Sequence, residues 1–337
     1  MKIAVLRALQ LGDLLCAVPA LRALRAAHPD AEISLVALPW ARELAARFPR
    51  YLDRHVEFPG FPGMPERPCS SSRLAEFARA MQRERFDLVL QMHGDGTYVN
   101  AIAAAMGGRR TAGYYLPGTP CPDRATFLEW RARDQEVLRW LRLTGHLGIP
   151  SRGTHLEFPL TDGDSETPRR LGLAAGTYAI LHPGSQLPSR RWPSERFAHV
   201  GDALAREGMR VGVTGGKAEA ALVQRTIASM RAPAIDASGT TLGALGGLIA
   251  GARILVCNDT SVSHIAAAVG TPSVVIACGS DPVRWSPLDR DLHRVLHHDV
   301  ECRPCPHREC PIGHPCALGV PVAGVLHETK ELLRCAA

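Results

Sequence analysis

The sequence predicts an α/β protein of two domains, each built on a doubly wound parallel sheet with helices on both faces. Three observations predict this class. Short apolar runs that suit buried strands alternate with amphipathic segments along the whole chain. Hydrophobic residues make up 46% of the chain but aromatic residues only 5%, and small aliphatic side chains suit helices packed on a sheet. The length of 337 residues favours two domains over one.

The first half of the chain supplies one series of strands and helices. Apolar runs of strand length occur at residues 3–6, 33–37, 86–90 and 111–114. Apolar residues recur at helical spacing in residues 14–27, 42–47, 73–84, 100–106 and 126–147. The stretches 58–68 and 116–122 are rich in Pro and are expected to be loops.

The second half repeats this alternation after a polar stretch at residues 161–168, which is typical of an interdomain linker. We therefore expect an N-terminal domain over residues 1–162 and a C-terminal domain over residues 168–337. The predicted strands are residues 178–181, 210–214, 254–258 and 273–277, and the predicted helices are residues 194–207 and 217–230. Ligands of such sheets bind beyond the carboxyl ends of the strands, so we expect the site in a cleft between two such edges.

The most informative segment is the strand–helix–strand unit at residues 254–276. Its strand ends in Asn-Asp-Thr-Ser, and an Ala-rich helix begins there. A helix N-terminus offers free N–H groups and the positive end of a dipole, which suit a phosphate. Asp259 would accept hydrogen bonds from sugar hydroxyls, and His264 lies one turn into the helix. Thr260 or Ser261 would cap the helix, and an ordinary cap by Asp or Ser is the alternative interpretation.

Composition excludes several classes of protein. No stretch approaches the ~18 uninterrupted apolar residues of a membrane span. Arg7, Gln10 and Asp13 interrupt the apolar N-terminus, so no signal peptide is predicted and a cytoplasmic location is expected. The pattern of basic residues lacks interleaved aromatics, zinc-finger spacing and a recognition helix, so nucleic acid is not an expected partner.

The positive charge is concentrated in the first half. Residues 1–150 contain 20 Lys and Arg against 15 Asp and Glu, a net charge of +5 out of +6 for the chain. Nineteen of these 20 cations are Arg, which favours bidentate contact with carboxylate or phosphate. An acidic substrate or an anionic membrane surface fits this asymmetry. A GC-rich genome that encodes Arg in place of Lys would give the same composition.

Five stretches together resemble a known family. They are Leu11-Gly12-Asp13; His182 to Ser185 with Arg190 to Pro193; Gly215 to Glu219; Asn258 to His264; and, more weakly, Gly279 to Pro282 with Pro287. In this order and spacing the chain resembles the heptosyltransferase-type glycosyltransferases of family 9. The resemblance implies the GT-B fold, with two Rossmann-like domains facing across a cleft. It also implies ADP-heptose as the donor, bound by the C-terminal domain.

The resemblance gives roles to particular residues of the donor site. Arg190, or alternatively Arg191, would neutralise the diphosphate, and Ser185 would donate to a phosphate oxygen. Glu219 would take the ribose hydroxyls. The N–H groups of Thr260 and Ser261 would face the diphosphate, and His264 would hydrogen-bond a phosphate or the sugar. The sequence departs from the family at Ser261, where the family usually has Gly, and this side chain would narrow the sugar pocket.

Asp13 is the candidate catalytic base. Inverting transfer needs a group that removes the proton of the attacking hydroxyl, and a carboxylate on the acceptor domain would do so. Asp13 follows Gly12 at a strand–helix turn, and a role as the cap of helix 14–27 is the alternative. No Asp-x-Asp motif occupies a turn of the donor site, so no cofactor is expected to be required for catalysis.

A cluster of four cysteines lies near the C-terminus. Cys302, Cys305, Cys310 and Cys316 are flanked by His307 and His314, and nearby prolines would stiffen the loop. This arrangement allows a structural Zn or Fe site. A reduced or partly disulfide-linked loop is the alternative.

The predicted function is transfer of heptose from ADP-heptose to an acidic, lipid-linked saccharide of the lipopolysaccharide inner core. Contact with the cytoplasmic face of the inner membrane would be peripheral and electrostatic. Three alternatives stay open: a transferase with another nucleotide-sugar or a protein acceptor, a GT-B-fold sugar-nucleotide epimerase or hydrolase, and a nucleotide-binding module without catalysis.

Overall fold

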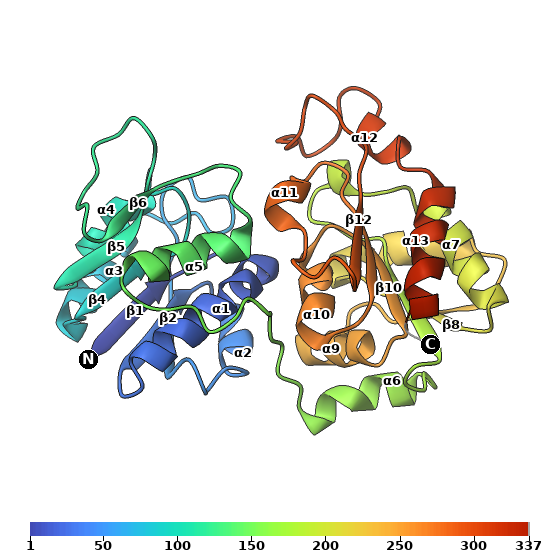
Figure 1. Cartoon of the computed structure of the whole chain (residues 1–337), viewed down its shortest axis with the longest axis horizontal. Coiled ribbons are helices and arrows are strands. Elements are labelled where there is room, and N and C mark those ends of the chain that lie inside the picture. Colours follow the sequence, from blue (N-terminus) through green and yellow to red (C-terminus); the bar gives the residue numbers. More distant parts are fainter. Residues whose placement is uncertain (336–337) are drawn as a thin grey trace. The chain divides into compact units, whose positions relative to one another are not determined.

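The computed structural model describes residues 1–335 and divides into two compact units, Met1–Thr154 and a second that begins at His155 (Figure 1). This boundary lies before the polar stretch 161–168. That stretch forms the 3₁₀ turn η1 (Asp162–Ser165) and the start of α6 (Glu166–Arg170), and both pack on α9 (Leu242–Ala250) of the second unit. Within residues 1–335, no helix is long and apolar enough to cross a membrane.

The first unit contains a six-stranded sheet with strand order β3-β2-β1-β4-β5-β6. Every neighbouring pair of these strands is parallel. The strands are β1 (Lys2–Leu6), β2 (Glu32–Ala37), β3 (Arg54–Glu57), β4 (Leu88–Gln91), β5 (Arg110–Tyr115) and β6 (Phe127–Glu129). The helices are α1 (Leu11–Ala27), α2 (Ala41–Ala45), α3 (Ser71–Glu84), α4 (Val99–Ala105) and α5 (Glu136–His146).

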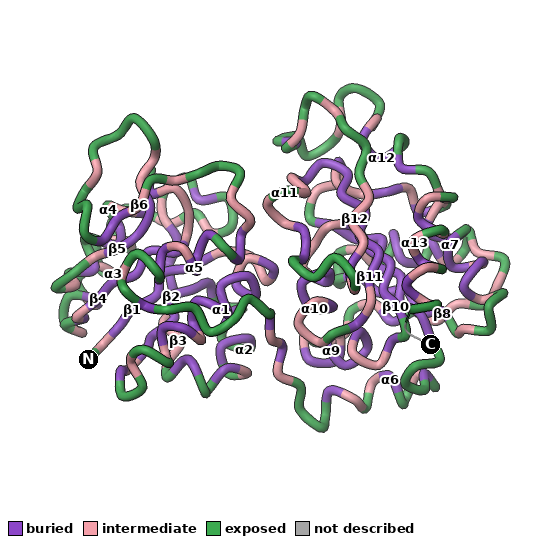
Figure 2. The backbone as a smooth tube through the Cα atoms, in the orientation of Figure 1, coloured by how far each residue is buried: buried purple, intermediate pink, exposed green. Residues whose placement is uncertain are grey.

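Both faces of this sheet are covered. Ala4 and Leu6 of the central strand β1 belong to a core cluster that includes Met81 of α3 and Ile102 of α4. Side chains alternate along a strand, so Ile3 and Val5 point to the opposite face, where α1 and α5 pack on each other (Figure 1). Burial on both faces explains why β1 is an almost continuous apolar run (Figure 2).

The second unit contains another six-stranded parallel sheet, with strand order β12-β11-β10-β7-β8-β9. Its strands are β7 (Tyr178–His182), β8 (Arg210–Val213), β9 (Ala234–Asp236), β10 (Ile254–Asn258), β11 (Ser273–Ile276) and β12 (His293–Leu296). Its remaining helices and 3₁₀ turns are η2 (Pro188–Arg190), α7 (Ser194–Arg206), η3 (Lys217–Glu219), α8 (Ala220–Ala228), α10 (Ser261–Val269), α11 (Pro282–Trp285), α12 (Pro315–Leu318) and α13 (Val322–Cys335).

The strands at the centre of this sheet are buried at every residue (Figure 2). One face packs in a core cluster with Trp192, Phe197 and Val325, which come from the segment before α7, from α7 and from α13. This burial requires helices on both faces, as in doubly wound folds. The sequence prediction of two such domains is therefore confirmed.

Each sheet has one point where the strand order reverses. In the first unit the chain runs outward from β1 through β2 to β3 and then returns to β4 on the other side of β1. In the second unit it runs from β7 through β8 to β9 and returns to β10 beside β7. Ligands of open parallel sheets bind beyond the carboxyl ends of the strands at this reversal. The topology thus marks β1 and β4, and β7 and β10, as the site-bearing strands.

The predicted helix over residues 126–147 is wrong in its first part. Residues 127–129 form the edge strand β6, which pairs with Gly113–Tyr115 of β5. Helix α5 begins only at Glu136, because the Gln135 side chain accepts hydrogen bonds from the amides of Val137 and Leu138 and caps the helix there.

Candidate active site

In the second unit, Asn258 connects the two strands at the reversal. It is the last residue of β10 and is fully buried. Its amide nitrogen donates to the Pro183 carbonyl (2.8 Å), and its side-chain oxygen accepts from the Trp192 amide (2.9 Å). Asn258 thereby holds the loop after β7 against the turn after β10. The sequence analysis gave this residue no role, because its partners are distant in the chain.

The predicted donor residues Ser185 and Glu219 lie at this edge, and Arg191 joins them. The Arg191 guanidinium donates twice to the Ser185 carbonyl (2.9 and 2.7 Å) and pairs with Glu219 (3.4 Å). The other oxygen of Glu219 accepts from the Gly216 amide (2.9 Å). A Cβ atom at Gly184 would approach this carboxylate to 2.3 Å, so Glu219 packs directly on the loop after β7.

Arg190 points elsewhere, towards the cysteine-containing segment. Its guanidinium donates to the Cys305 carbonyl (3.4 Å). The neighbouring Ser189 hydroxyl donates to the His307 carbonyl (2.6 Å), and the Ser189 carbonyl lies 2.7 Å from Nε2 of His314. Residues 305–314 thus brace the segment that carries Arg190. The sequence analysis treated the two segments separately, and their contact depends on long-range packing.

Asp259 lies directly after β10 and is largely buried. Burial raises the pKa of its carboxyl group to about 6, while the Ser280 hydroxyl and the charges of Arg190 and Arg303 oppose this shift. Arg303 also donates to the carbonyls of Ala277 (3.0 Å) and Ser280, and so it holds the turn after β11. Arg190 and Asp259, both predicted donor residues, are therefore electrostatic neighbours.

The N-terminus of α10 lies directly after Asp259. Thr260 is the N-cap residue, and its side chain makes no capping hydrogen bond. Ser261 is the first helical residue. His264, one turn on, is buried, and its ring packs edge-on against Trp285 of α11 (6.1 Å between centroids). The backbone amides of the first turn remain suited to an anion.

His182 is a buried group that the donor prediction did not include. It ends β7, and its Nδ1 lies 2.9 Å from the Thr214 hydroxyl at the end of β8. Burial lowers the pKa of its imidazole to about 4, a shift that the Glu219 carboxylate opposes. His182 is therefore neutral at pH 7 and joins the carboxyl ends of two adjacent strands.

The four cysteines do not form a ligand set. Among residues 1–335, no group of three or more His, Cys, Asp and Glu side chains is placed to hold a metal ion. Cys305 and Cys316 are buried while Cys302 is exposed, and all are free thiols. The arrangement does not support the structural Zn or Fe site that the sequence allowed. No disulfide links these four cysteines, so the partly disulfide-linked alternative is not supported either.

In the first unit, Asp13 lies in the first turn of α1, just beyond the carboxyl end of β1. Its carboxylate accepts from the Gln10 amide (3.2 Å), so it caps the first turn of α1 from the third helical position. The sequence alternative, Asp13 as the cap residue of a helix over 14–27, is wrong in its position, because the helix begins at Leu11 and Gln10 is its N-cap residue. This contact fixes the carboxylate at the carboxyl end of β1, where the strand order reverses.

A buried arginine sets the surroundings of Asp13. Arg7 is 0% exposed and donates to the Asp13 carbonyl (2.7 Å), and its guanidinium lies 3.8 Å from the Asp13 carboxylate. Glu136 of α5, also 0% exposed, accepts from Arg7 (3.0 Å) and from the Trp140 indole (2.9 Å). The Trp140 ring also packs on the guanidinium (4.5 Å). The buried positive charge of Arg7 needs a negatively charged partner, and the Glu136 carboxylate is that partner.

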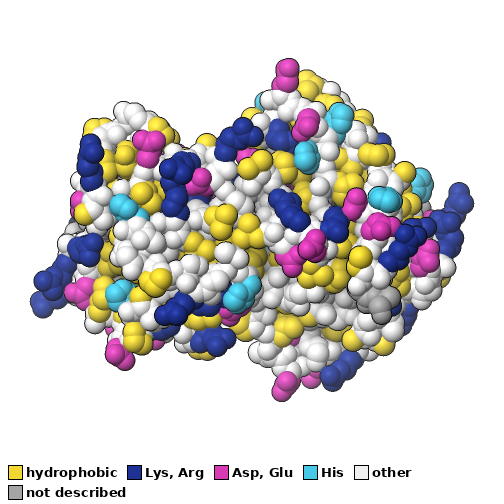
Figure 3. Space-filling view, in the orientation of Figure 1, with side chains coloured by type: hydrophobic (Ala, Val, Ile, Leu, Met, Phe, Trp, Pro, Cys, Tyr) yellow, Lys and Arg dark blue, Asp and Glu magenta, His cyan; other side chains and the backbone are white. Residues whose placement is uncertain are grey.

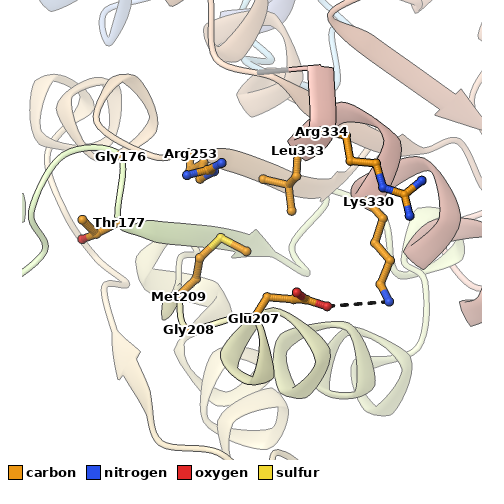
Figure 4. Close-up of a pocket in the computed structure, with 9 residues that line it drawn as sticks. All are labelled: Gly176, Thr177, Glu207, Gly208, Met209, Arg253, Lys330, Leu333 and Arg334. Carbon is orange, nitrogen blue, oxygen red and sulfur yellow. Dashed lines mark ion pairs between the residues drawn. The ribbon is translucent and has the colours of Figure 1, made fainter. Parts of the chain in front are cut away.

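A large pocket lies at the opposite edge of the second sheet. It has a volume of about 560 Å³. Thr177, Met209 and Arg253 line it just before β7, β8 and β10, with Lys330 and Glu207 paired across it (3.7 Å) (Figure 4). None of the predicted donor residues lines this pocket. The pocket is at the amino ends of the strands, away from the topological reversal.

Basic side chains form no single patch on the face shown in Figure 3. Lys and Arg are scattered over it, with Asp and Glu among them. Several N-terminal arginines are already paired, for example Arg25 with Asp53 (2.5 Å) and Arg67 with Glu57 (2.6 Å). The net charge of this half is therefore spread over a mixed surface.

Comparison with known proteins identifies the family. Residues 74–315, more than half of the chain, match Glycosyltransferase family 9 (heptosyltransferase). The chain belongs to this family. The resemblance noted in the sequence is confirmed, and the turns after β7, β8 and β10 lie within the matched residues.

Curated relatives are lipopolysaccharide heptosyltransferases at modest identity. Heptosyltransferase 2 of Escherichia coli (strain K12) is 24% identical over 305 residues, 86% of each chain. Heptosyltransferase 3 of the same strain is 23% identical over 336 residues, 96% of this chain and 95% of the relative. With another Escherichia coli heptosyltransferase 3 the identity is 29%, but the match spans only about half the length of that relative (47%).

Solved structures show the same fold. The family 9 glycosyltransferase from Veillonella parvula superposes with a TM-score of 0.80 at 22% identity, covering 99% of this chain and 97% of that one. E. coli ADP-heptose LPS heptosyltransferase II gives 0.76 at 21% identity, with 99% of each chain covered. The E. coli heptosyltransferase WaaC with ADP-2-deoxy-2-fluoro heptose gives 0.66 at 17%, covering 100% of both. The fold is therefore GT-B, with two Rossmann-like domains.

Proposed function

We propose that this family 9 glycosyltransferase transfers heptose, with inversion, from ADP-heptose to an acidic saccharide of the lipopolysaccharide inner core. The observation that carries the proposal is the position of the two residue sets. Asp13 and the donor residues each lie at the carboxyl ends of strands where the order of a sheet reverses. The names of the relatives, several of them lipopolysaccharide heptosyltransferases, support the donor and the acceptor.

The donor would bind at the carboxyl edge of the second sheet. The diphosphate would face the N-terminus of α10 at Thr260 and Ser261, with Arg190 and Ser185 as further donors of hydrogen bonds. Glu219 would accept hydrogen bonds from the ribose hydroxyls. Asp259 and His264 would contact the sugar or the phosphates. These groups would balance the diphosphate charge, so the proposed reaction needs no metal cofactor.

Asp13 would act as the general base. Its carboxylate removes the proton from the attacking hydroxyl of the acceptor while that oxygen bonds to the anomeric carbon of the heptose. The bond between the anomeric carbon and the ADP oxygen breaks on the opposite face, which inverts the configuration. ADP leaves as an anion, and the N-terminus of α10 and Arg190 would stabilise its developing charge.

The acceptor would be lipid-linked and would bind the first unit, whose net charge supports an acidic partner. We propose peripheral contact with the cytoplasmic face of the inner membrane, carried by this charge.

Ser261 would affect which donor sugar binds, because its side chain would approach the sugar more closely than glycine does. We therefore expect a donor sugar that tolerates this narrower pocket, and a panel of ADP- and UDP-sugars would identify it.

Two substitutions test the division of roles. Asp13→Asn should reduce the rate of transfer from ADP-heptose by ~10²–10⁴ and leave ADP affinity unchanged. Arg190→Ala should instead weaken ADP binding by about 1.5–3 kcal/mol, because a charged hydrogen bond to the diphosphate is lost. Calorimetric ADP titration and single-turnover transfer measure the two effects. Equal loss of ADP binding and turnover in Asp13→Asn would contradict the role as base, and ADP release without acceptor would favour a hydrolase.

A further inference from the structure

Three rings from two loops lie in a row at the same edge as Asp13: His93 and Tyr98 from the loop after β4, and Phe61 from the loop after β3. His93 follows β4 and its ring lies edge-on to Phe61 (6.4 Å between centroids). Phe61 stacks in turn on Tyr98 (6.4 Å, 24° between planes). Tyr98 is 71% exposed, although aromatic residues are scarce in this chain and the other large ones are mostly buried. An exposed ring of this kind marks a binding surface more often than an isolated aliphatic side chain does.

The loop after β4, which carries His93 and Tyr98, is held by side-chain hydrogen bonds. The buried Gln91 side chain accepts from the His93 amide (2.9 Å) and donates to Asn100 (3.0 Å). Asn100 donates in turn to the Tyr114 carbonyl (2.8 Å). Gly96 has a φ of +90°, and a Cβ there would approach Asn100 to 2.2 Å. The loop is thus held in one conformation, and the exposure of Tyr98 follows from it.

His93 links the row to the turn that carries Asp13. Its Nδ1 accepts from the Ala8 amide (3.2 Å) just after β1, so the proton of the neutral ring lies on Nε2. Burial, with a smaller effect of Arg7, lowers the pKa of the imidazole to about 4, so the ring is neutral at pH 7. No described residue accepts a hydrogen bond from Nε2, which leaves one donor next to the strand reversal.

We infer that His93, Phe61 and Tyr98 form an acceptor subsite for one uncharged pyranose ring. This inference rests on the proposed function, because Asp13 fixes where the reacting hydroxyl lies. The apolar C–H face of a sugar ring stacks on an exposed aromatic ring, and a fixed N–H donor suits a sugar oxygen. A pyranose ring stacked on Tyr98 would lie near Asp13, but it would not be the ring whose hydroxyl reacts. The three residues carry no charge, so they would recognise the shape of the sugar ring. The phosphates or carboxylates of the acceptor would be bound by arginines instead.

The test compares substitutions in binding and in turnover. The probe is a deacylated lipopolysaccharide inner-core saccharide, used with the full-length protein. Tyr98→Ala should raise its Kd and its KM by roughly three- to tenfold, with kcat and ADP affinity unchanged. Tyr98→Phe should behave as the parent protein because the ring remains. His93→Ala should raise the KM similarly, and His93→Gln should restore part of the loss because its amide also donates.

Leu138→Ala supplies the matched control. Leu138 is another exposed apolar residue of the first unit (45% exposed), on α5, and its removal should leave both constants unchanged. NMR gives a readout that loop stability would not change: ring protons of the saccharide should shift upfield with the parent protein and not with Tyr98→Ala. Parent-like saccharide binding by Tyr98→Ala would overturn the inference. Tyr98-dependent binding without transfer from ADP-heptose would contradict the proposed donor but support the subsite.

Discussion

At the scale of single residues, the first unit buries opposite charges beside the candidate base. Arg7 contacts Asp13, and Glu136 compensates the guanidinium on its other side. Removing one member of a buried pair leaves an uncompensated charge in a low-dielectric environment. The basicity of Asp13 should therefore depend on both partners, in opposite directions.

We predict that Glu136→Gln moves the acid limb of the kcat/KM profile to lower pH and lowers the plateau. The uncompensated Arg7 then stabilises the Asp13 carboxylate, which ionises more readily and is a weaker base. Arg7→Met should move the same limb to higher pH, because it removes the positive charge beside the Asp13 carboxylate, while Glu136 keeps its contact with Arg139 (3.5 Å). Profiles from pH 4 to 9, with thermal unfolding as a check on folding, measure these shifts. Limbs that do not move in either variant would show that the pair has only a structural role.

At the scale of elements, the packing of α9 on η1 joins residues 161–165 to the second unit. A Cβ at Gly247 of α9 would lie 2.0 Å from the Asp164 carbonyl, which is backbone and cannot swing away. Gly247→Ala should therefore destabilise the protein by about 1–3 kcal/mol, the usual cost of overpacking. Gly145→Ala in α5 is the control, since nothing lies within 4 Å of its Cβ position and alanine favours helix. Opposite changes in the midpoint of thermal unfolding are expected, and equal changes would contradict the close contact.

Strands and helices with a clear apolar pattern were predicted from the sequence. Elements whose structure depends on contacts with distant segments were not. The central strands are buried on both faces, so each reads as an apolar run. The edge strands β3, β9 and β12 are short and less buried, and they were not predicted. Helix α9 was missed because it contains three glycines in nine residues, which lower helix propensity. These glycines allow the close contact with η1.

In the candidate site, too, residues in local turns were predicted and residues that act through distant contacts were not. Asp13, Glu219 and Asp259 follow strands in recognisable turns, so their place at the carboxyl edges could be predicted. The residues that orient them could not. Asn258 acts through Pro183 and Trp192, and Arg303 acts through the turn after β11. Such partners are distant in sequence, and no local pattern identifies them. The cysteine spacing suggested a metal, but no group of side chains in residues 1–335 is placed to hold one, and the cysteine-containing segment instead contacts Ser189.

At the scale of the whole molecule, charge is divided between the two halves of the chain. Residues 1–150 carry +5 of the net charge of +6, and arginines provide almost all of it. The arginines are not gathered in one visible patch, so their effect on a partner would come from the summed field as well as from single contacts (Figure 3). Summed fields of exposed charges are screened by salt, whereas contacts in a partly buried site are screened less.

Salt dependence therefore tests the assignment of the acceptor to the first unit. Raising the salt concentration from 0.1 M to 1 M shortens the Debye length from ~10 Å to ~3 Å. The KM for an acidic inner-core saccharide should rise steeply over this range. The Kd for ADP should rise less, because Asp259 and its neighbours are largely buried. A neutral saccharide of the same size is the control and should show little change. If the acidic saccharide is equally insensitive, the arginine excess reflects codon composition, and the acidic acceptor loses its support from charge.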